Sequence, residues 1–281
     1  GKFEEITAQI GAVLGTDEID ISKKAVIIMC ADNGIVEEGI SQSGQEVTLA
    51  VAKEMAKGIS SVGKMAAFVG AETIPVDIGI NHPTPVSGVL DRKVRLGTRN
   101  FKKEPAMTEE EALKAIFTGI QLAADCKEKG CRMLATGEMG IGNTTTSSAV
   151  AAALLKCSAE EVTGRGAGLC DEKLQHKKRI ITEAIESYHL YEAEPLTVLA
   201  TVGGLDIAGL AGVCIGGALF HIPVVLDGVI SMVAGLAAER LVPGTIQYLI
   251  PSHKGKEPAV KKMTETLQME PVIDGNMALG E

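Results

Sequence analysis

One short stretch of this chain, GEMGIGNTTT (137–146), combines glycines with hydroxyl side chains and a carboxylate. The stretch lies between the apolar runs 132–135 and 147–155, so the pattern predicts a strand, a glycine-rich turn and a helix start. A helix N-terminus offers backbone N–H groups and a positive dipole end to an anion. Because the carboxylate of Glu138 suits sugar hydroxyls, a phosphorylated sugar is the first ligand that we expect.

This turn matches neither of the common phosphate-binding signatures. A P-loop needs Lys before the Ser or Thr, where this chain has Asn143. The dinucleotide fingerprint needs a third glycine, where this chain has Thr145. A tight turn capped by hydroxyl groups is therefore the structural alternative to a ligand site.

Further candidate residues follow other turns. A second glycine-rich turn, 162–168, precedes a basic run, and a phosphate would use its N–H groups with one lysine as the counter-charge. Asp206 and Asp227 each follow an expected strand, where they would bind ribose, act as a base or cap the next helix. Ser252 is interpreted as a ligand contact and His253 as structural. The polar loop 31–43 either lines a pocket or is disordered.

Composition narrows the class of protein. The 281 residues are 46% hydrophobic but only 3% aromatic, with 32 glycines and a net charge of −9. The negative charge argues against nucleic acid and against an anionic membrane surface as partners. Six cysteines without a C-x-x-C pair or zinc-like histidine spacing predict reduced thiols, a cytoplasmic location and no metal site. An uninterrupted membrane-length apolar segment is not apparent.

Short β-branched runs alternate with helical patterns along the chain. Strands are expected at 24–30, 73–79, 132–135, 196–202, 223–226 and 248–253, and a long helix over 108–129 begins with a capping box. This alternation predicts an α/β fold with a mostly parallel sheet and helices on both faces. Ligands of such sheets gather beyond the carboxyl ends of the strands, where most of the turns described above fall.

Together the motifs resemble the nicotinate-nucleotide:dimethylbenzimidazole phosphoribosyltransferases of cobamide synthesis. The matching segments follow one another in order over almost the whole chain: 24–41, 76–80, 137–149, 164–168, 202–212, 226–231, 248–253 and 269–281. The resemblance implies a doubly wound, Rossmann-like main domain over 1–281, with a small helical subdomain formed by 1–20 and 255–281. It also implies a homodimer that needs no cofactor and no metal.

The resemblance implies a reaction and a set of site residues. Phosphoribose passes from nicotinate mononucleotide to a base such as 5,6-dimethylbenzimidazole, which gives α-ribazole 5′-phosphate and nicotinate. The residues expected to bind the nucleotide and its phosphate are Glu138, Gly140, Asn143, Thr144, Gly166, Lys177, Asp227, Gly228 and Ser252. Those expected around the incoming base are Ser43, Met139 and Leu279. Glu281, in a match to the family's L-G-E-G turn, is expected to be the catalytic base.

The chain departs from the family pattern in three places. The family's segment before the first helix is missing, and the chain stops at Glu281, before the turn and helices that should hold this carboxylate; a fragment of a longer protein, with an incomplete small subdomain, is therefore expected. Val51 stands where some relatives carry a polar side chain, so another benzimidazole, a purine or a phenolic base is an alternative acceptor.

Two other functions remain as alternatives. One is a non-catalytic nucleotide-binding subunit that pairs with an active paralogue in a heterodimer. The other is a dinucleotide-dependent dehydrogenase, which the missing third glycine disfavours.

Overall fold

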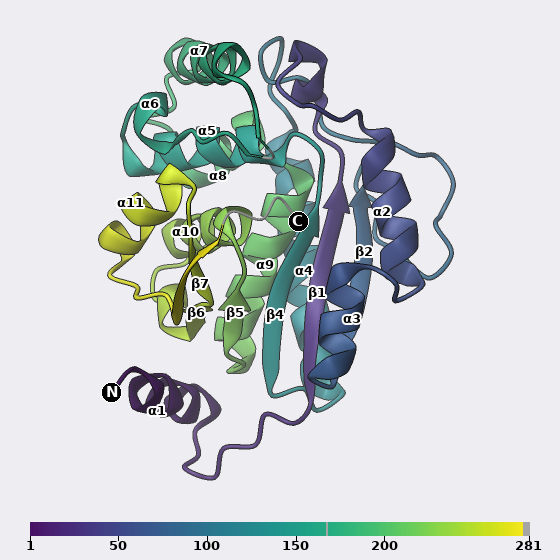
Figure 1. The fold of residues 1–281 in the computed structure, drawn as a ribbon, viewed down its shortest axis with the longest axis vertical. Coiled ribbons are helices and arrows are strands. Elements are labelled where there is room, and N and C mark those ends of the chain that lie inside the picture. Colours follow the sequence, from purple (N-terminus) through teal and green to yellow (C-terminus); the bar gives the residue numbers. More distant parts are fainter. Residues whose placement is uncertain (167, 278–281) are drawn as a thin grey trace.

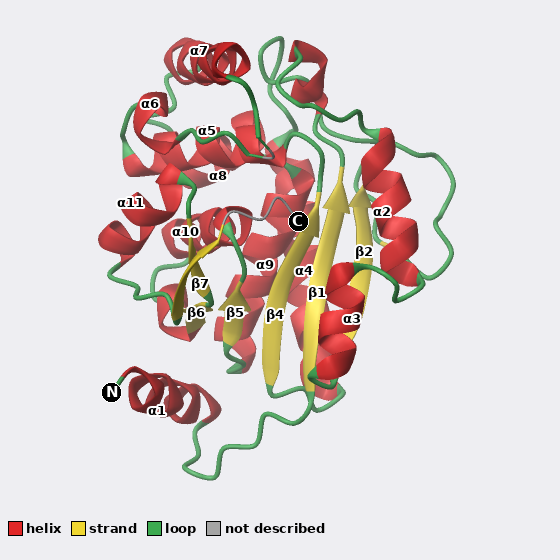
Figure 2. Ribbon diagram, in the orientation of Figure 1, coloured by secondary structure: helices red, strands yellow, loops and turns green. Residues whose placement is uncertain are grey.

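A six-stranded parallel sheet forms the centre of the molecule in this computed structural model, which describes residues 1–166 and 168–277 (Figures 1 and 2). Its strand order is β3-β2-β1-β4-β5-β6, the order of Rossmann folds. Helices cover both faces of the sheet. The predicted doubly wound α/β fold is therefore confirmed.

The strands and helices have the following bounds. The strands are β1 (Lys24–Ala31), β2 (Ala71–Gly79), β3 (Leu90–Asp91), β4 (Met133–Met139), β5 (Val224–Leu226), β6 (Leu249–Pro251), β7 (His253–Gly255) and β8 (Ile273–Met277). The α-helices are α1 (Lys2–Leu14), α2 (Glu46–Ala56), α3 (Ser61–Phe68), α4 (Glu109–Glu128), α5 (Asn143–Leu155), α6 (Ala159–Val162), α7 (Asp171–Ser187), α8 (Pro195–Val202), α9 (Leu205–Phe220), α10 (Val229–Leu241) and α11 (Pro258–Leu267). Two short 3₁₀ helices are η1 (Gly34–Glu38) and η2 (Thr245–Tyr248).

Strand β1 is the central strand because its side chains are apolar on both faces. It pairs with β2 on one side and with β4 on the other, and residues from Ile27 to Ala31 are buried. A strand covered by helices on both faces is expected to be a continuous apolar run rather than an alternating one. The chain order reverses between β1 and β4, and this is the switch point at which such folds bind ligands.

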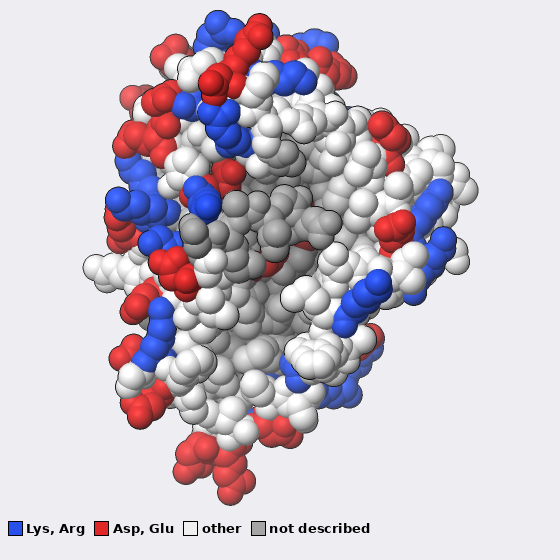
Figure 3. All heavy atoms as spheres, in the orientation of Figure 1, with Lys and Arg blue, Asp and Glu red and all other residues white. Residues whose placement is uncertain are grey.

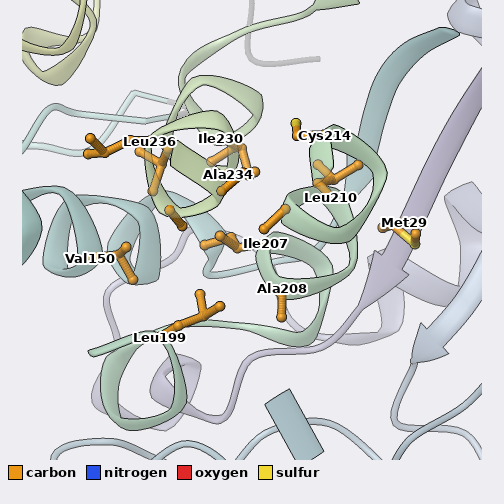
Figure 4. Close-up of a cluster of buried hydrophobic side chains, with 14 of the residues drawn as sticks. Met29, Val150, Leu199, Ile207, Ala208, Leu210, Cys214, Ile230, Ala234 and Leu236 are labelled. Carbon is orange, nitrogen blue, oxygen red and sulfur yellow. The ribbon is translucent and has the colours of Figure 1, made fainter. Parts of the chain in front are cut away.

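Helices α4 and α9 cover one face of the sheet and pack closely against each other (Figure 1). A Cβ on Gly212 would clash with the backbone of Ile116, and one on Gly119 would clash with the backbone of Gly209. Glycine is required at these positions because the two helix backbones approach so closely. Figure 4 shows side chains of α9 facing α10 and β1 in the same apolar cluster.

The opposite face is covered by α2 and α3, which enclose a smaller apolar cluster that includes Ile28, Ala52 and Ile80. Helix α4 begins with the predicted capping box. The Thr108 hydroxyl accepts the Glu111 N–H at 3.1 Å, and the Glu111 carboxylate accepts the Thr108 N–H at 2.9 Å.

One predicted strand is wrong. Residues 196–202 belong to helix α8, which begins at Pro195 and packs against α4, α5 and α10. A short apolar run fits a buried strand and a buried helix equally well. The proline at the first helical position was the local signal for a helix, because its fixed φ suits a helix start.

Helix α1, at the start of the chain, lies beside the β6 edge of the sheet (Figure 1). The Gln9 amide of α1 donates to the carbonyl oxygens of Gln247 and Leu249, and Lys2 pairs with Glu270 at 3.1 Å. Helix α11 packs against α5, α6 and α10, and β7 pairs with β8. The small helical subdomain formed by 1–20 and 255–281 stays a prediction.

Candidate active site

A cavity of about 230 Å³ opens beyond the carboxyl end of β4, next to the switch point. In Figure 3 this face of the molecule is hollowed near its centre, and most charged side chains lie around the rim. Eight predicted site residues line the cavity: Glu138, Met139, Gly140, Asn143, Thr144, Gly166, Asp227 and Gly228. Residues 40–42 also line it, so the loop after β1 contributes to the pocket as expected.

The turn between β4 and α5 uses several of its own backbone donors. The Ile141 N–H donates to the Thr48 hydroxyl at 3.2 Å, and the N–H groups of Asn143 and Thr145 donate to carbonyl oxygens of the same turn at 3.0 Å. The anion cradle that the glycine spacing suggested is therefore only partly available to a ligand. What the turn does present to the cavity is the carboxylate of Glu138.

Glu138, which is half-buried, belongs to a cluster of polar side chains in which Asn143 and Asp206 are buried. The Asn143 amide donates to the Glu138 carboxylate and, at 3.1 Å, to Oδ2 of Asp206, which lies in the first turn of helix α9 and is fully buried. Burial raises the pKa of Glu138 to about 8, and the negative charge of Asp206 adds to the rise. Burial also raises the pKa of Asp206, to about 6.

Gly140 makes room for this cluster. A Cβ at Gly140 would clash with Oδ2 of Asp206 and would lie 2.6 Å from the backbone oxygen of Ala31. The sequence suggested that this glycine lets the backbone approach a ligand. The structure gives it a further reason, because the Asp206 carboxylate and the end of β1 already fill the space.

A cationic region lies on the other side of the cavity. Lys177 is completely buried on α7, and its Nζ donates to Thr144 Oγ1 at 2.9 Å and to the Gly164 carbonyl at 3.3 Å. Burial lowers the pKa of Lys177 to about 8. Lys177 does not line the cavity itself but supports the Thr144 hydroxyl that does.

A carboxylate from a distant part of the chain lies against the second glycine-rich turn, 162–168. The Gly166 N–H donates to Oε1 of Glu257 at 3.0 Å, so this carboxylate occupies a donor that a phosphate would use. Arg165 also lines the cavity and donates to the Leu169 carbonyl at 2.7 Å. Neither Arg165 nor Glu257 was among the predicted site residues, and only the fold brings Glu257 to this turn.

Two other predicted residues, Ser252 and Ser43, lie near the cavity but do not line it. The Ser252 hydroxyl contacts the Asp227 carbonyl at 3.5 Å and His253 Nδ1 at 2.9 Å; Asp227 itself follows β5, and Gly228 is the N-cap of α10. Ser43 is exposed next to the lining segment 40–42. Leu279 and Glu281 lie outside the described residues.

Two further observations concern the described residues only. Within 1–166 and 168–277 no group of three or more His, Cys, Asp or Glu side chains is placed to hold a metal ion. In the same part of the chain, no helix combines the length and apolar character needed to cross a membrane.

The chain and its fold are similar to those of known proteins. The model of a family described as phosphoribosyltransferase matches residues 1–281. The nicotinate-nucleotide–dimethylbenzimidazole phosphoribosyltransferase of Acetivibrio thermocellus is 46% identical over 281 residues, which are 100% of this chain and 80% of that protein. The protein of the same name from Ruminiclostridium cellulolyticum is 44% identical with the same coverage. The crystal structure of CobT from Thermus thermophilus superposes with a TM-score of 0.95 at 35% identity, over 99% of this chain and 84% of that one.

This chain therefore belongs to the family of nicotinate-nucleotide–dimethylbenzimidazole phosphoribosyltransferases. The resemblance of the sequence motifs to this family is confirmed.

Proposed function

We propose that this chain transfers 5-phosphoribose from nicotinate mononucleotide to a lower-ligand base such as 5,6-dimethylbenzimidazole, giving α-ribazole 5′-phosphate and nicotinate. The observation that carries the proposal is one cavity with two chemically different sides. A buried lysine, a hydroxyl and a glycine turn on one side suit a phosphate. The carboxyl group of Glu138 on the other side suits the ribose.

In this proposal Thr144 and Gly166, supported by Lys177, hold the phosphate. Glu138 and Asn143 face the ribose and the leaving nicotinate, and Asp227 and Gly228 close the nucleotide side. These contacts align C1′ with the incoming base, and such alignment supplies a large part of the rate of a two-substrate reaction. Ser252 completes the phosphate pocket from the end of β6.

The incoming base lies between Met139, Ser43 and Leu279. One ring nitrogen attacks C1′ while the other loses its proton, and the bond from C1′ to the pyridinium nitrogen of nicotinate breaks. The carboxylate of Glu281 accepts the proton, because a benzimidazole N–H is only weakly acidic. A positioned proton acceptor of this kind contributes roughly 10²–10⁴-fold.

The reaction is tested by incubating the protein with nicotinate mononucleotide and 5,6-dimethylbenzimidazole and separating the products by chromatography. Equal amounts of nicotinate and α-ribazole 5′-phosphate are expected. Nucleotide binding without product would favour the non-catalytic subunit instead. Replacing the benzimidazole with a purine or a phenol in the same assay measures the acceptor range that Val51 leaves open.

The role of Glu281 is tested with Glu281→Gln, which should lower turnover by at least ~10²-fold while nucleotide binding is retained. The matched control is Glu265→Gln, an exposed carboxylate on α11 whose loss should leave turnover unchanged. Equal turnover of Glu281→Gln and the parent would remove Glu281 as the base.

A further inference from the structure

Asp206 is a completely buried carboxylate. Among the described residues, no Lys or Arg forms an ion pair with Asp206 or with Glu138. An ionised carboxylate taken out of water without a counter-charge is costly, and the usual solution is a proton or several hydrogen bonds.

The chain makes room for this carboxylate from two sides. Gly140 leaves space for Oδ2 and Gly204 for Oδ1, because a Cβ at either glycine would clash with these oxygens. Oδ1 accepts the Ile207 N–H at 3.0 Å and the side chain of Asn33 also interacts with Asp206. These contacts hold Asp206 in one orientation, with Oδ2 directed toward Asn143.

Asn143 joins Asp206 to Glu138. Its Nδ2 atom carries two N–H groups, and Nδ2 donates to both carboxylates. The ionisable groups that face Glu138 are Asp206 on α9, Asp227 after β5 and the Cys30 thiol on β1. None of them supplies a positive charge, so two neighbouring carboxylates share this space, and one of them is stabilised by keeping a proton.

We propose that Asp206 is a positioning residue that acts through Asn143 and keeps a proton on Glu138, so that Glu138 presents an O–H donor to the bound nucleotide. Nothing in the names of the relatives assigns a role to Asp206. The inference rests on the proposed function only for the identity of the nucleotide.

A protonated Glu138 suits an anionic nucleotide. An ionised carboxylate only accepts hydrogen bonds and would repel the negative charges of nicotinate mononucleotide, whereas a carboxylic acid donates one hydrogen bond and accepts others. Because Asp206 is buried behind Asn143, its negative charge acts on Glu138 without touching the nucleotide. Glu138, which faces the ligand, therefore stays neutral, and the negative charge lies on Asp206 behind Asn143.

Asp206 also lies in the first turn of α9, so a purely structural role is the competing explanation. A structural role changes stability when Asp206 is replaced. It leaves the protonation of Glu138 where it was. The two explanations therefore differ in the titration of Glu138.

The first experiment is an infrared titration of the ligand-free protein, which does not depend on the reaction. The parent should show a protonated-carboxyl band at pH 7 that disappears in Glu138→Gln and titrates near pH 8. In Asp206→Asn the same band should titrate at a pH lower by about one unit, because a neighbouring like charge is gone. A Glu138 band that is absent at pH 7, or that titrates identically in Asp206→Asn, would overturn the inference.

The second experiment measures the KM for nicotinate mononucleotide against pH. In the parent KM should rise above pH about 8, and Asp206→Asn should move this rise to lower pH while kcat changes less than KM. Lys177 also loses its proton near pH 8, so its contribution to the rise should remain in all variants. The double variant Glu138→Gln/Asp206→Asn should match Glu138→Gln alone, and Asp17→Asn, an exposed acid, is the control.

An Asp206→Asn variant that loses stability but keeps the pH dependence of the parent would assign Asp206 a structural role only. If α-ribazole 5′-phosphate does not form at all, the proposed function fails, but the infrared titration still decides the protonation of Glu138.

Discussion

The two sides of the cavity bury charge in opposite ways. On the acidic side, Glu138 and Asp206 share an amide donor from Asn143, and no cation among the described residues pairs with either of them. On the cationic side, Lys177 is buried on α7, donates to one hydroxyl and one carbonyl oxygen, and is close enough to Glu257 for that negative charge to act on it. Burial raises the pKa on the first side and lowers it on the second, so that both Glu138 and Lys177 titrate near pH 8.

In the proposed function, this contrast is how a chain with a net charge of −9 provides a site for an anionic nucleotide. The charge of the whole surface cannot attract the ligand, so the site depends on a few positioned groups. Holding Glu138 neutral removes a repulsion, and keeping Lys177 charged below pH 8 adds an attraction. The predictions below change one side at a time.

The largest effect is expected on the cationic side. Lys177→Met keeps the shape of the side chain but removes the charge and the support of Thr144, so kcat/KM should fall by about 100-fold, mainly through KM for the nucleotide. Steady-state kinetics measures this change. Arg179→Met, an exposed position on the same helix, is the control, and an unchanged KM in Lys177→Met would exclude a phosphate role for Lys177.

The next effect concerns the space around the acidic side. Gly140→Ala should lower the free energy of unfolding by about 1–3 kcal/mol, because the new Cβ meets Asp206 and the Ala31 backbone. Gly228→Ala is the matched control, since nothing lies within 4 Å of a Cβ there. Urea unfolding of both variants compares them, and equal stability would contradict the close packing around Asp206.

The third effect is the pH dependence of stability, which has opposite signs on the two sides. Between pH about 4.5 and 8 the folded state keeps the Glu138 proton that the unfolded chain loses, so the free energy of unfolding falls as pH rises. Between about 8 and 10.5 the unfolded chain keeps the Lys177 proton, so this contribution rises with pH. Urea unfolding at each pH gives the difference in the free energy of unfolding between the parent and Glu138→Gln, and between the parent and Lys177→Met. These two differences should change with pH in opposite directions, and a change in the same direction would contradict the prediction.

The smallest effect is expected from the carboxylate that occupies the second glycine turn. Glu257→Gln removes a negative charge that competes with phosphate for the Gly166 N–H, so KM for the nucleotide should fall about threefold. Glu265→Gln, on the exposed side of α11, serves as the comparison. A higher KM in Glu257→Gln would mean that Glu257 holds the nucleotide instead of competing with it.

Local features of the site were predictable because they depend on near neighbours in sequence. The strand–turn–helix around Gly140, the capping box at Thr108 and the position of Asp227 after a strand all follow from residue spacing. The prediction was wrong where a buried strand and a buried helix have the same local pattern, since the apolar run after Pro195 is a helix and not a strand. The cradle of N–H groups at the first glycine turn was only partly right, because a distant hydroxyl, that of Thr48, uses one of its donors.

The sequence by itself determined the α/β class, the edge of the sheet at which ligands gather, and the family resemblance, because these depend on periodicity and on motifs in order. Only the tertiary structure decided which groups meet. Asn143 reaches Asp206 across 63 residues, Gly166 reaches Glu257 across 91 and Ile141 reaches Thr48 across 93. These tertiary contacts also determine burial, because burial depends on how much water the packed elements exclude. Burial in turn shifts the pKa of Glu138 and of Lys177.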